Sequence, residues 1–388
     1  MSDKKNGKSV SVICEYNPFH YGHLYQLEQL KEKYSTVICI MSGDTVQRGE
    51  VAVADKYIRA KAAVDCGADL VISLPFPYCM LSARDFASAG VYIASAVCSD
   101  ALAFGCEDDT EKLFKAVDFL LSDEYSIAIN TEIKEKKNIS FPRARYAVVE
   151  KHCGEDIAKI LQLPNNILGI EYISAIKKGK CPLEVYTVKR QQEYMSSSKI
   201  RLELFGGGSP CEFLPQGSAA VYDGLALRRT EYLEKAVFAS LLSKESIENV
   251  YEICGGWDKK ILSAARQAAT LEELYDLSST SVYPRSKVRR AVLSAFFGIG
   301  ADAVKSVPEY TCVLGANENG LKYLSEIRKK AKISVLTKPA HYKTLSESAQ
   351  SAFLAEQTAE RICALAQPTY DPESFIKRKP YIKKAVSE

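Results

Sequence analysis

Hydrophobic and polar positions in the first 110 residues follow two alternating periods. Short apolar runs with the length and β-branched content of buried strands lie at 10–14, 37–41, 70–74 and 101–104. Between them, apolar residues recur at helical spacing over 24–33, 54–66 and 81–98. Strands separated by helices of this length predict right-handed crossovers and a parallel sheet that helices cover on both faces.

The pattern changes after residue 205. Residues 206–210 read Gly-Gly-Gly-Ser-Pro, which is the clearest linker signal in the chain. Beyond the linker the periodic segments are mainly helical, at 231–242, 259–268, 271–277, 287–297, 320–330 and 346–363. We therefore predict an α/β domain with a parallel sheet over residues 1–205 and a mainly α-helical C-terminal domain over residues 206–388.

A polar turn follows the first predicted strand. His20 and His23, two of the four histidines in the chain, lie where this strand meets the next predicted helix. The N-terminus of a helix offers free N–H groups and the positive end of its dipole, which favour a phosphate. Gly22 lets the backbone approach a ligand, and imidazoles can donate to phosphoryl oxygens. A lone histidine is more often structural, but a pair in one turn favours a functional role.

The turn resembles a known motif. His20-Tyr21-Gly22-His23 is similar to the HxGH signature of the nucleotidyltransferase and class I aminoacyl-tRNA synthetase superfamily. The longer string Glu15-Tyr16-Asn17-Pro18-Phe19-His20-Tyr21-Gly22-His23 is more specific and closely resembles the bacterial tRNA(Met) cytidine acetate ligases. The resemblance implies a Rossmann-like HxGH nucleotidyltransferase domain. It also implies an ATP-dependent ligase that forms N4-acetylcytidine at the wobble position of elongator tRNA(Met).

The family resemblance further implies the course of the reaction and the residues that bind ATP. Acetate attacks the α-phosphorus of ATP, which gives acetyl-adenylate and pyrophosphate, and the cytidine amine then takes the acetyl group and releases AMP. The implied ATP-binding residues are Val12, Ile13, Cys14, Glu15, Tyr16, Asn17, Pro18, Phe19, His20, Tyr21, Gly22, His23, Leu24, Tyr25, Gly105, Asn165, Asn166, Arg190, Ser197 and Arg201.

Some of these positions have structural alternatives. In the family an asparagine of the motif around 163–172 contacts ATP, and Asn166 is our first choice and Asn165 the second. Either asparagine could instead simply cap the helix that follows. Gly105 resembles a family position where the chain passes the nucleotide without a side chain in the way. Arg48 lies in a loop, 42–50, that is very similar to one in the acetate ligases, and we favour a functional role for it.

The predicted catalytic residues are His20, His23, Lys56, Ser198 and Lys199. The run of serines at 196–198 could only cap a helix, but hydroxyls, N–H groups and cations at a helix start also form an anion site. The superfamily carries such a loop opposite its histidines, where it holds the departing pyrophosphate. Lys56, at the start of a predicted helix, could be a solvated residue or could reach the phosphates; both readings are open.

Charge limits the choice of partners. The 388-residue chain has a formal net charge of +3, too small for a bulk nucleic-acid binder, so RNA would have to contact local basic patches. Three basic groups follow the linker, within 283–290, 329–332 and 377–384. One such run is usually solvated, but three in one domain favour a polyanion surface. The predicted tRNA-binding residues are Arg285, Lys287, Arg289 and Arg290.

Composition gives expectations about location and cofactors. No apolar run approaches the ~18 residues that a membrane span needs, so we expect no membrane contact. The twelve cysteines are scattered without a CxxC pair, as in a reduced, cytoplasmic protein. We see no metal-ligand cluster; Mg²⁺ would arrive with ATP and be held mainly by its phosphates.

Two other functions stay open. A nucleotidyltransferase that acts on a phosphorylated small molecule would share the first half of the chemistry, but it would not need a helical domain with three basic groups. A non-catalytic, nucleotide-gated RNA-binding protein is the second alternative. The intact histidine pair and the basic serine loop argue against it.

Overall fold

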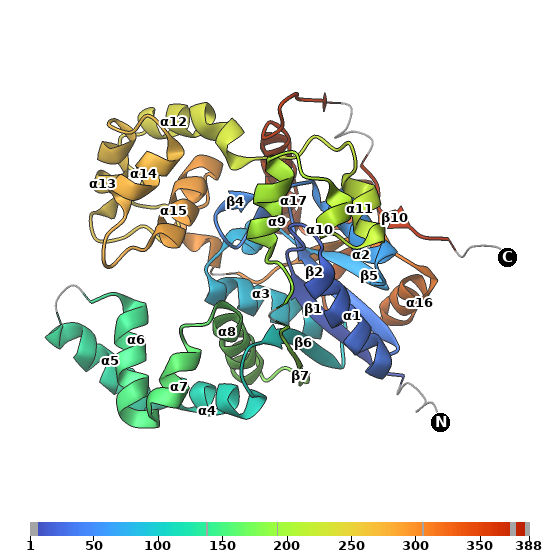
Figure 1. Cartoon of the computed structure of the whole chain (residues 1–388), viewed down its shortest axis with the longest axis horizontal. Helices are drawn as coiled ribbons and strands as arrows, with labels where there is room; N and C mark the ends of the chain where they lie inside the picture. The colour runs from blue at the N-terminus through green and yellow to red at the C-terminus, as the bar shows by residue number, and fades with distance from the viewer. Residues whose placement is uncertain (1–6, 137–138, 192, 305, 373–377, 385–388) are drawn as a thin grey trace.

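A single mixed sheet forms the centre of the molecule (Figure 1). The computed structural model describes residues 7–136, 139–191, 193–304, 306–372 and 378–384. The strand order is β10-β8-β5-β2-β1-β6-β7, and β9 also pairs with β8. Neighbouring strands are parallel except β5 and β8, which are antiparallel.

The described strands and helices have the following bounds. The strands are β1 (Ser9–Cys14), β2 (Thr36–Ser42), β3 (Thr45–Val46), β4 (Glu50–Val51), β5 (Leu70–Leu74), β6 (Ala101–Cys106), β7 (Glu184–Lys189), β8 (Tyr310–Ala316), β9 (Ser334–Leu336) and β10 (Tyr381–Ile382). The helices before the linker are α1 (Tyr21–Lys33), α2 (Lys56–Asp65), α3 (Ala83–Ala96), α4 (Thr110–Leu120), α5 (Asp123–Glu135), α6 (Phe141–Cys153), α7 (Glu155–Ile160), α8 (Pro164–Gly179) and α9 (Ser197–Phe205). Those after it are α10 (Pro210–Phe213), α11 (Gln216–Tyr222), α12 (Glu234–Leu242), α13 (Trp257–Ala265), α14 (Leu271–Ser278), α15 (Arg285–Phe297), α16 (Glu318–Ile327) and α17 (Glu347–Ala364). No helix in the described ranges is both long enough and apolar enough to cross a membrane.

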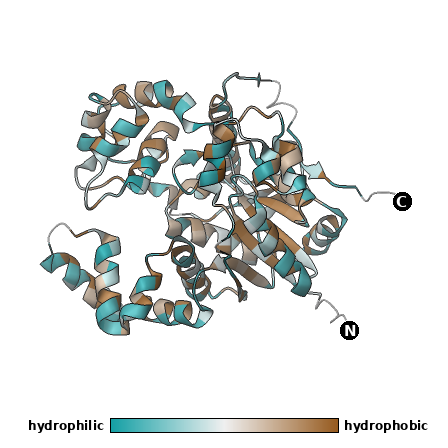
Figure 2. Ribbon diagram, in the orientation of Figure 1, coloured by the Kyte–Doolittle hydropathy of each residue, from teal (hydrophilic) through white to brown (hydrophobic). Residues whose placement is uncertain are grey.

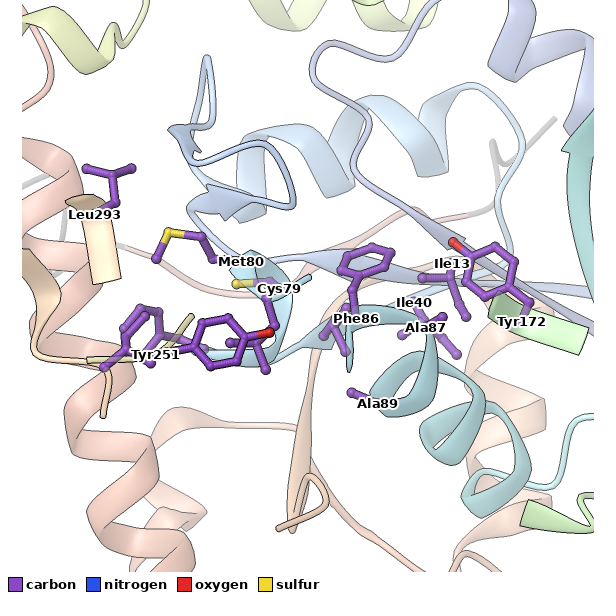
Figure 3. Close-up of a cluster of buried hydrophobic side chains, with 14 of the residues drawn as sticks. Ile13, Ile40, Cys79, Met80, Phe86, Ala87, Ala89, Tyr172, Tyr251 and Leu293 are labelled. Atoms are coloured by element: carbon purple, nitrogen blue, oxygen red, sulfur yellow. The ribbon is translucent and has the colours of Figure 1, made fainter. Parts of the chain in front are cut away.

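The alternation of side chains along the strands divides the core into two layers. Val10 and Val12 of β1 pack in a cluster with residues of α1 and α2, whereas Ile13 packs in a second cluster with α3. Figure 3 shows Phe86 of α3 in the cluster that contains Ile13. Gly90 permits the close packing of α3 on Ile13, because a Cβ at Gly90 would lie 2.5 Å from Cδ1 of Ile13. Figure 2 shows the apolar strands inside and hydrophilic outer faces on the helices. The α/β sheet predicted from the sequence is therefore confirmed.

The second half of the chain is mainly helical but also completes the sheet. Figure 1 shows α12–α15 as a group of helices beside the sheet, on the same side as α4–α7. However, β8, β9 and β10 join the central sheet, and β8 pairs directly with β5. The sequence analysis did not predict these strands, so the sheet extends beyond residues 1–205. That residues 1–205 bind ATP and residues 206–388 bind tRNA stays a prediction.

A buried ion pair joins the two halves. Lys56 at the start of α2 is 1% exposed, and its Nζ lies 2.6 Å from Glu356 and also contacts Glu360, both on α17. Burial alone would lower the pKa of Lys56, but the two carboxylates outweigh it and hold that pKa well above its usual value. The suggestion that Lys56 reaches the phosphates is thus corrected, because its ammonium group is enclosed by glutamates of the second half.

We expect Lys56→Met to destabilise the fold. The change leaves Glu356 buried without Lys56 and leaves Glu360 with Arg378, 3.5 Å away, as its remaining cation among the described residues. Breaking a buried pair from one side typically costs about 3–5 kcal/mol. Urea denaturation gives the free energy of unfolding. Lys61→Met, which removes a more exposed partner of Asp65 on the same helix, should cost only about 0–1 kcal/mol. If the Lys56→Met protein kept its stability but lost its activity, the prediction that Lys56 is catalytic would stand again.

Candidate functional site

A pocket of about 460 Å³ opens at the carboxyl ends of β1, β6 and β7. The chain runs from β1 outward to β2 and β5, and then returns to the other side of β1 with β6. The strand order therefore reverses between β1 and β6. Ligands of open α/β sheets bind at such switch points, because the loops after the two strands diverge and leave a crevice.

The histidine turn forms one end of this pocket. His20 is the N-cap of α1, and its Nδ1 accepts a hydrogen bond from the backbone N–H of Gly22 at 3.1 Å. Nδ1 of His23 accepts from the backbone N–H of His20 at 3.3 Å, and the two rings stack with centroids 3.8 Å apart. Because both Nδ1 atoms are acceptors, the proton of each neutral ring resides on Nε2. Each ring therefore keeps an Nε2–H donor for a ligand.

The surroundings keep both rings neutral. Burial, with a smaller effect from the charge of Arg190, lowers the pKa of His20 to about 4. Burial, together with His20 and Arg190, also holds the pKa of His23 well below its usual value. Gly22 leaves room for the ring of His20, because a Cβ at this position would lie 3.0 Å from its Cε1 and the ring would have to shift by a few tenths of an ångström. At neutral pH the pair thus offers hydrogen-bond donors and no net charge.

A carboxylate organises the opposite wall. Glu107, directly after β6, accepts hydrogen bonds from Nδ2 of Asn165 at 2.6 Å and from Nη1 of Arg190 at 3.4 Å. Asn166 is fully buried, and its Oδ1 accepts from the backbone N–H of Glu107 at 3.0 Å. Asn165 lies in the pocket wall and Asn166 does not, and which of the two contacts ATP stays a prediction. The sequence analysis did not single out Glu107. A charged residue directly after an apolar strand is the signal that could have found it.

The serine loop supplies a helix start to the pocket. Ser196 is the N-cap of α9, and its side chain caps no N–H group among the described residues. The first N–H groups of α9 are therefore available to an anion beside Ser197 and Ser198. Arg201, one turn later, donates from Nη1 to the carbonyl of Asn17 at 2.8 Å.

Most of the predicted ATP-binding residues meet at this pocket. Its wall contains Val12, Ile13, Cys14, Glu15, Tyr16, Asn17, His20, Gly22, His23, Tyr25, Gly105, Asn165, Arg190, Ser197 and Arg201, together with Ser198. Outside the wall lie Pro18, Phe19, Tyr21, Leu24, Asn166 and Lys199. Phe19, for example, is fully buried in the core. Contacts of the wall residues with ATP stay predictions.

The sequence analysis also missed several wall residues, namely Gln47, Phe86, Phe104, Leu168, Tyr172 and Tyr194. Phe104 and Tyr172 lie in apolar patterns on a strand and a helix, where local periodicity indicates only the core. Arg48, which was favoured, does lie in the wall.

The predicted tRNA-binding residues lie together on α15, but most of their charge is compensated. Arg285 pairs with Glu272 and Asp276. Arg289 pairs with Glu50 at 2.6 Å, and Arg290 is 9% exposed and donates twice to Glu252. Lys287 instead lies over the rings of Trp257 and Tyr283, which stack on each other. The structure therefore favours Lys287 over the arginines as a phosphate contact. Lys377, in the third basic group, lies outside the described residues.

We expect the low pKa of His20 to make stability depend on pH. The pKa is about 4 in the folded protein and 6.5 ordinarily, so the unfolded chain binds the proton first as pH falls. The stability from the neutral ring is therefore complete above about pH 6.5 and is lost as pH falls toward 4. His20→Asn keeps a capping acceptor. In urea denaturation, its free energy of unfolding should fall less than that of the wild type between pH 6.5 and 4. His341→Asn, at an exposed histidine, is the control, and identical losses in all three proteins would contradict the assignment.

Comparison with known proteins agrees with this geometry. The sequence model of the family described as HIGH Nucleotidyl Transferase matches residues 7–376. The tRNA(Met) cytidine acetate ligase of Caldanaerobacter subterraneus is 34% identical over 369 residues, which cover 88% of this chain and 92% of that protein. The ligase of the same name from Acetivibrio thermocellus is 31% identical and covers 85% of this chain and 88% of its own length. The crystal structure of Thermotoga maritima TmcAL bound with alpha-thio ATP has a TM-score of 0.90 at 26% identity, covering 97% of this chain and 100% of that one. The chain therefore belongs to the HIGH nucleotidyl transferase family and, within it, to the tRNA(Met) cytidine acetate ligases.

Proposed function

We propose that this protein is an ATP-dependent ligase that acetylates N4 of the wobble cytidine of elongator tRNA(Met). The observation that carries the proposal is the pocket with two neutral histidines at one helix N-terminus and a serine-rich helix start in the same wall. The named activity of its relatives and the ATP analogue in the Thermotoga structure support it. The reaction would take place in the cytoplasm, where tRNA is available.

Activation of acetate is the first step. Acetate is a poor acyl donor because oxide would have to leave, so one of its oxygens attacks the α-phosphorus of ATP and pyrophosphate departs. The Nε2–H groups of His20 and His23 would stabilise the charge that develops on the phosphoryl oxygens. Pyrophosphate would be held by Ser197, Ser198 and the N–H groups of α9. Mg²⁺ would enter with ATP, bound mainly by the phosphates.

Acetyl transfer is the second step. The cytidine amine is weakly nucleophilic, so its position relative to the acetyl carbon should matter more than a strong base. RNA-modifying proteins reach such a base by splaying it out of the loop. The helical group α12–α15 borders the β3–β4 hairpin, since Arg289 pairs with Glu50 of β4. We place the tRNA contact on this side, with residues 1–205 as the main ATP-binding part and residues 206–388 as the main tRNA-binding part.

We expect His23→Asn to block activation without unfolding the protein. Asparagine can still accept the hydrogen bond from the backbone of His20, but it lacks the Nε2–H donor. Loss of one charge-stabilising donor typically lowers the rate by ~10²–10³. Acetate-dependent exchange of labelled pyrophosphate into ATP measures this step in the absence of tRNA. Exchange close to the wild-type rate in a folded His23→Asn protein would refute the role of the histidine.

We expect Lys287→Gln to weaken tRNA binding and leave activation unchanged. Loss of one phosphate contact on single-stranded RNA should reduce the slope of log K against log salt by roughly 0.7. Filter binding of the tRNA at several salt concentrations measures this slope. Lys178→Gln, at an exposed lysine of α8, is the control. If both variants bind like the wild type, Lys287 belongs only to its stack with Trp257 and Tyr283.

A further inference from the structure

A second cavity of about 280 Å³ adjoins the nucleotide pocket. The two cavities share Glu50, Ser198 and Arg201 in their walls. The remaining walls come from Gly49 and Val51, from α9, from residues 228–231 and from residues of α14 and α15. The activation of acetate described above makes no use of this space.

The walls of the second cavity carry charged residues of both signs. Its charged residues are Arg201, Arg228, Arg229 and Arg289, against Glu50, Glu231 and Glu272. Glu50 bridges two of the arginines, at 2.6 Å from Arg289 and 3.2 Å from Arg201. Arg228 is also paired with Asp44, which lies outside the wall, so the guanidinium groups offer N–H donors without an excess of charge, and the glutamates can accept hydrogen bonds from amines.

Polar atoms buried around the cavity have no partner in the described part of the chain. Tyr275 is 3% exposed and Arg228 is 2% exposed, yet the hydroxyl of Tyr275 and Nε of Arg228 form no hydrogen bond there. Nε of Arg289 is also buried and has no hydrogen-bond partner among the described residues. Buried polar groups are nearly always hydrogen-bonded, so these three atoms mark residues of the cavity wall whose polar partners are missing among the described residues.

The flat surfaces of the cavity suit a single base. Phe205 lies in the wall with the guanidinium of Arg229 at 4.3 Å from its ring centroid. The ring of Tyr275 has the guanidinium of Arg289 at 5.5 Å. Aromatic and guanidinium planes are the surfaces on which unstacked RNA bases lie. A volume of 280 Å³, near the lower limit of about 300 Å³ for small-molecule sites, fits one nucleoside and not a stretch of RNA.

We propose that this cavity receives the acceptor cytidine, which rests on the function proposed above. Once pyrophosphate has left Ser198, a base in the second cavity and acetyl-adenylate in the first would meet near the shared residues Glu50 and Arg201. There the bond from N4 to the acetyl carbon forms and the bond from that carbon to the AMP oxygen breaks. AMP leaves with the electron pair of the broken bond, and the proton lost by the amine passes to water.

Photocross-linking locates the base directly. A tRNA(Met) with 4-thiouridine in place of the acceptor cytidine carries sulfur where the reactive amine would be. After irradiation with the full-length protein, we expect cross-links in peptides that contain wall residues of the cavity, within 49–51, 201–205, 228–231 or 271–275 or at Arg289. Cross-links confined to other parts of the chain would overturn the proposal.

Two variants test the cavity by its effect on the second step. Leu202 lines the cavity and is 70% exposed, so Leu202→Trp narrows the mouth with little effect on folding. We expect it to lower kcat/KM for tRNA at least tenfold (~10-fold being the effect of about 1.4 kcal/mol) while pyrophosphate exchange is unchanged. Tyr275→Phe removes only the unpartnered hydroxyl and should lower kcat/KM by roughly 3- to 10-fold, the usual effect of one hydrogen bond.

Leu277→Trp is the matched control, because Leu277 is exposed on the same helix as Tyr275 and outside the cavity wall. Normal tRNA acetylation by Leu202→Trp would overturn the cavity proposal alone. Loss of pyrophosphate exchange in Leu202→Trp would also overturn it, since the cavity would then serve ATP or pyrophosphate. Absence of acetate-dependent exchange in the wild type would instead refute the proposed function.

Discussion

Buried charges that must be paired hold the two halves of this protein together. Asp44, 4% exposed after β2, pairs with Arg228 at 2.7 Å and lies 3.5 Å from Arg378. Burial would raise the pKa of Asp44, but these arginines outweigh it and hold the pKa well below its usual value. Lys56 and Glu356 form a similar buried pair. Because an unpaired buried charge is very costly, the loop after β2 can fold only together with the second half of the chain.

This constraint determines the shape of the site. The loop fixed by Asp44 leads into Gln47, Arg48 and Glu50, which line the nucleotide pocket. Arg59, fully buried, donates to the backbone carbonyls of Glu15, Ser42 and Gly43 and so ties the ends of β1 and β2 together. Backbone carbonyls satisfy this guanidinium without a carboxylate. The histidine turn and the loop with Glu50 are thereby held at one edge of the sheet, where one wall can serve two cavities.

The sequence predicted the parts of this arrangement that depend on neighbouring residues. Runs of β-branched residues predicted the first strands, and the HxGH turn led to the pocket because its residues are contiguous. The structure differs where distant segments decide. From its local sequence Lys56 could be solvated or could reach a phosphate. In the structure Glu356, 300 positions later in the chain, encloses its ammonium group. Strand β8 has an ordinary apolar pattern, and its pairing with β5 cannot be read from it. The arginines of α15 resembled a basic surface because their partners, such as Glu50 and Glu252, lie elsewhere in the chain.

The central claim is that the pocket at β1 and β6 joins acetate to the α-phosphorus of ATP before the acetyl group moves to RNA. Acetate labelled with ¹⁸O in its carboxylate tests it, with ATP, tRNA(Met) and the full-length protein. If acetyl-adenylate forms, the AMP released on acetyl transfer retains one acetate oxygen, and mass spectrometry finds AMP with a single ¹⁸O. Unlabelled AMP, or ADP and phosphate in its place, would contradict the account.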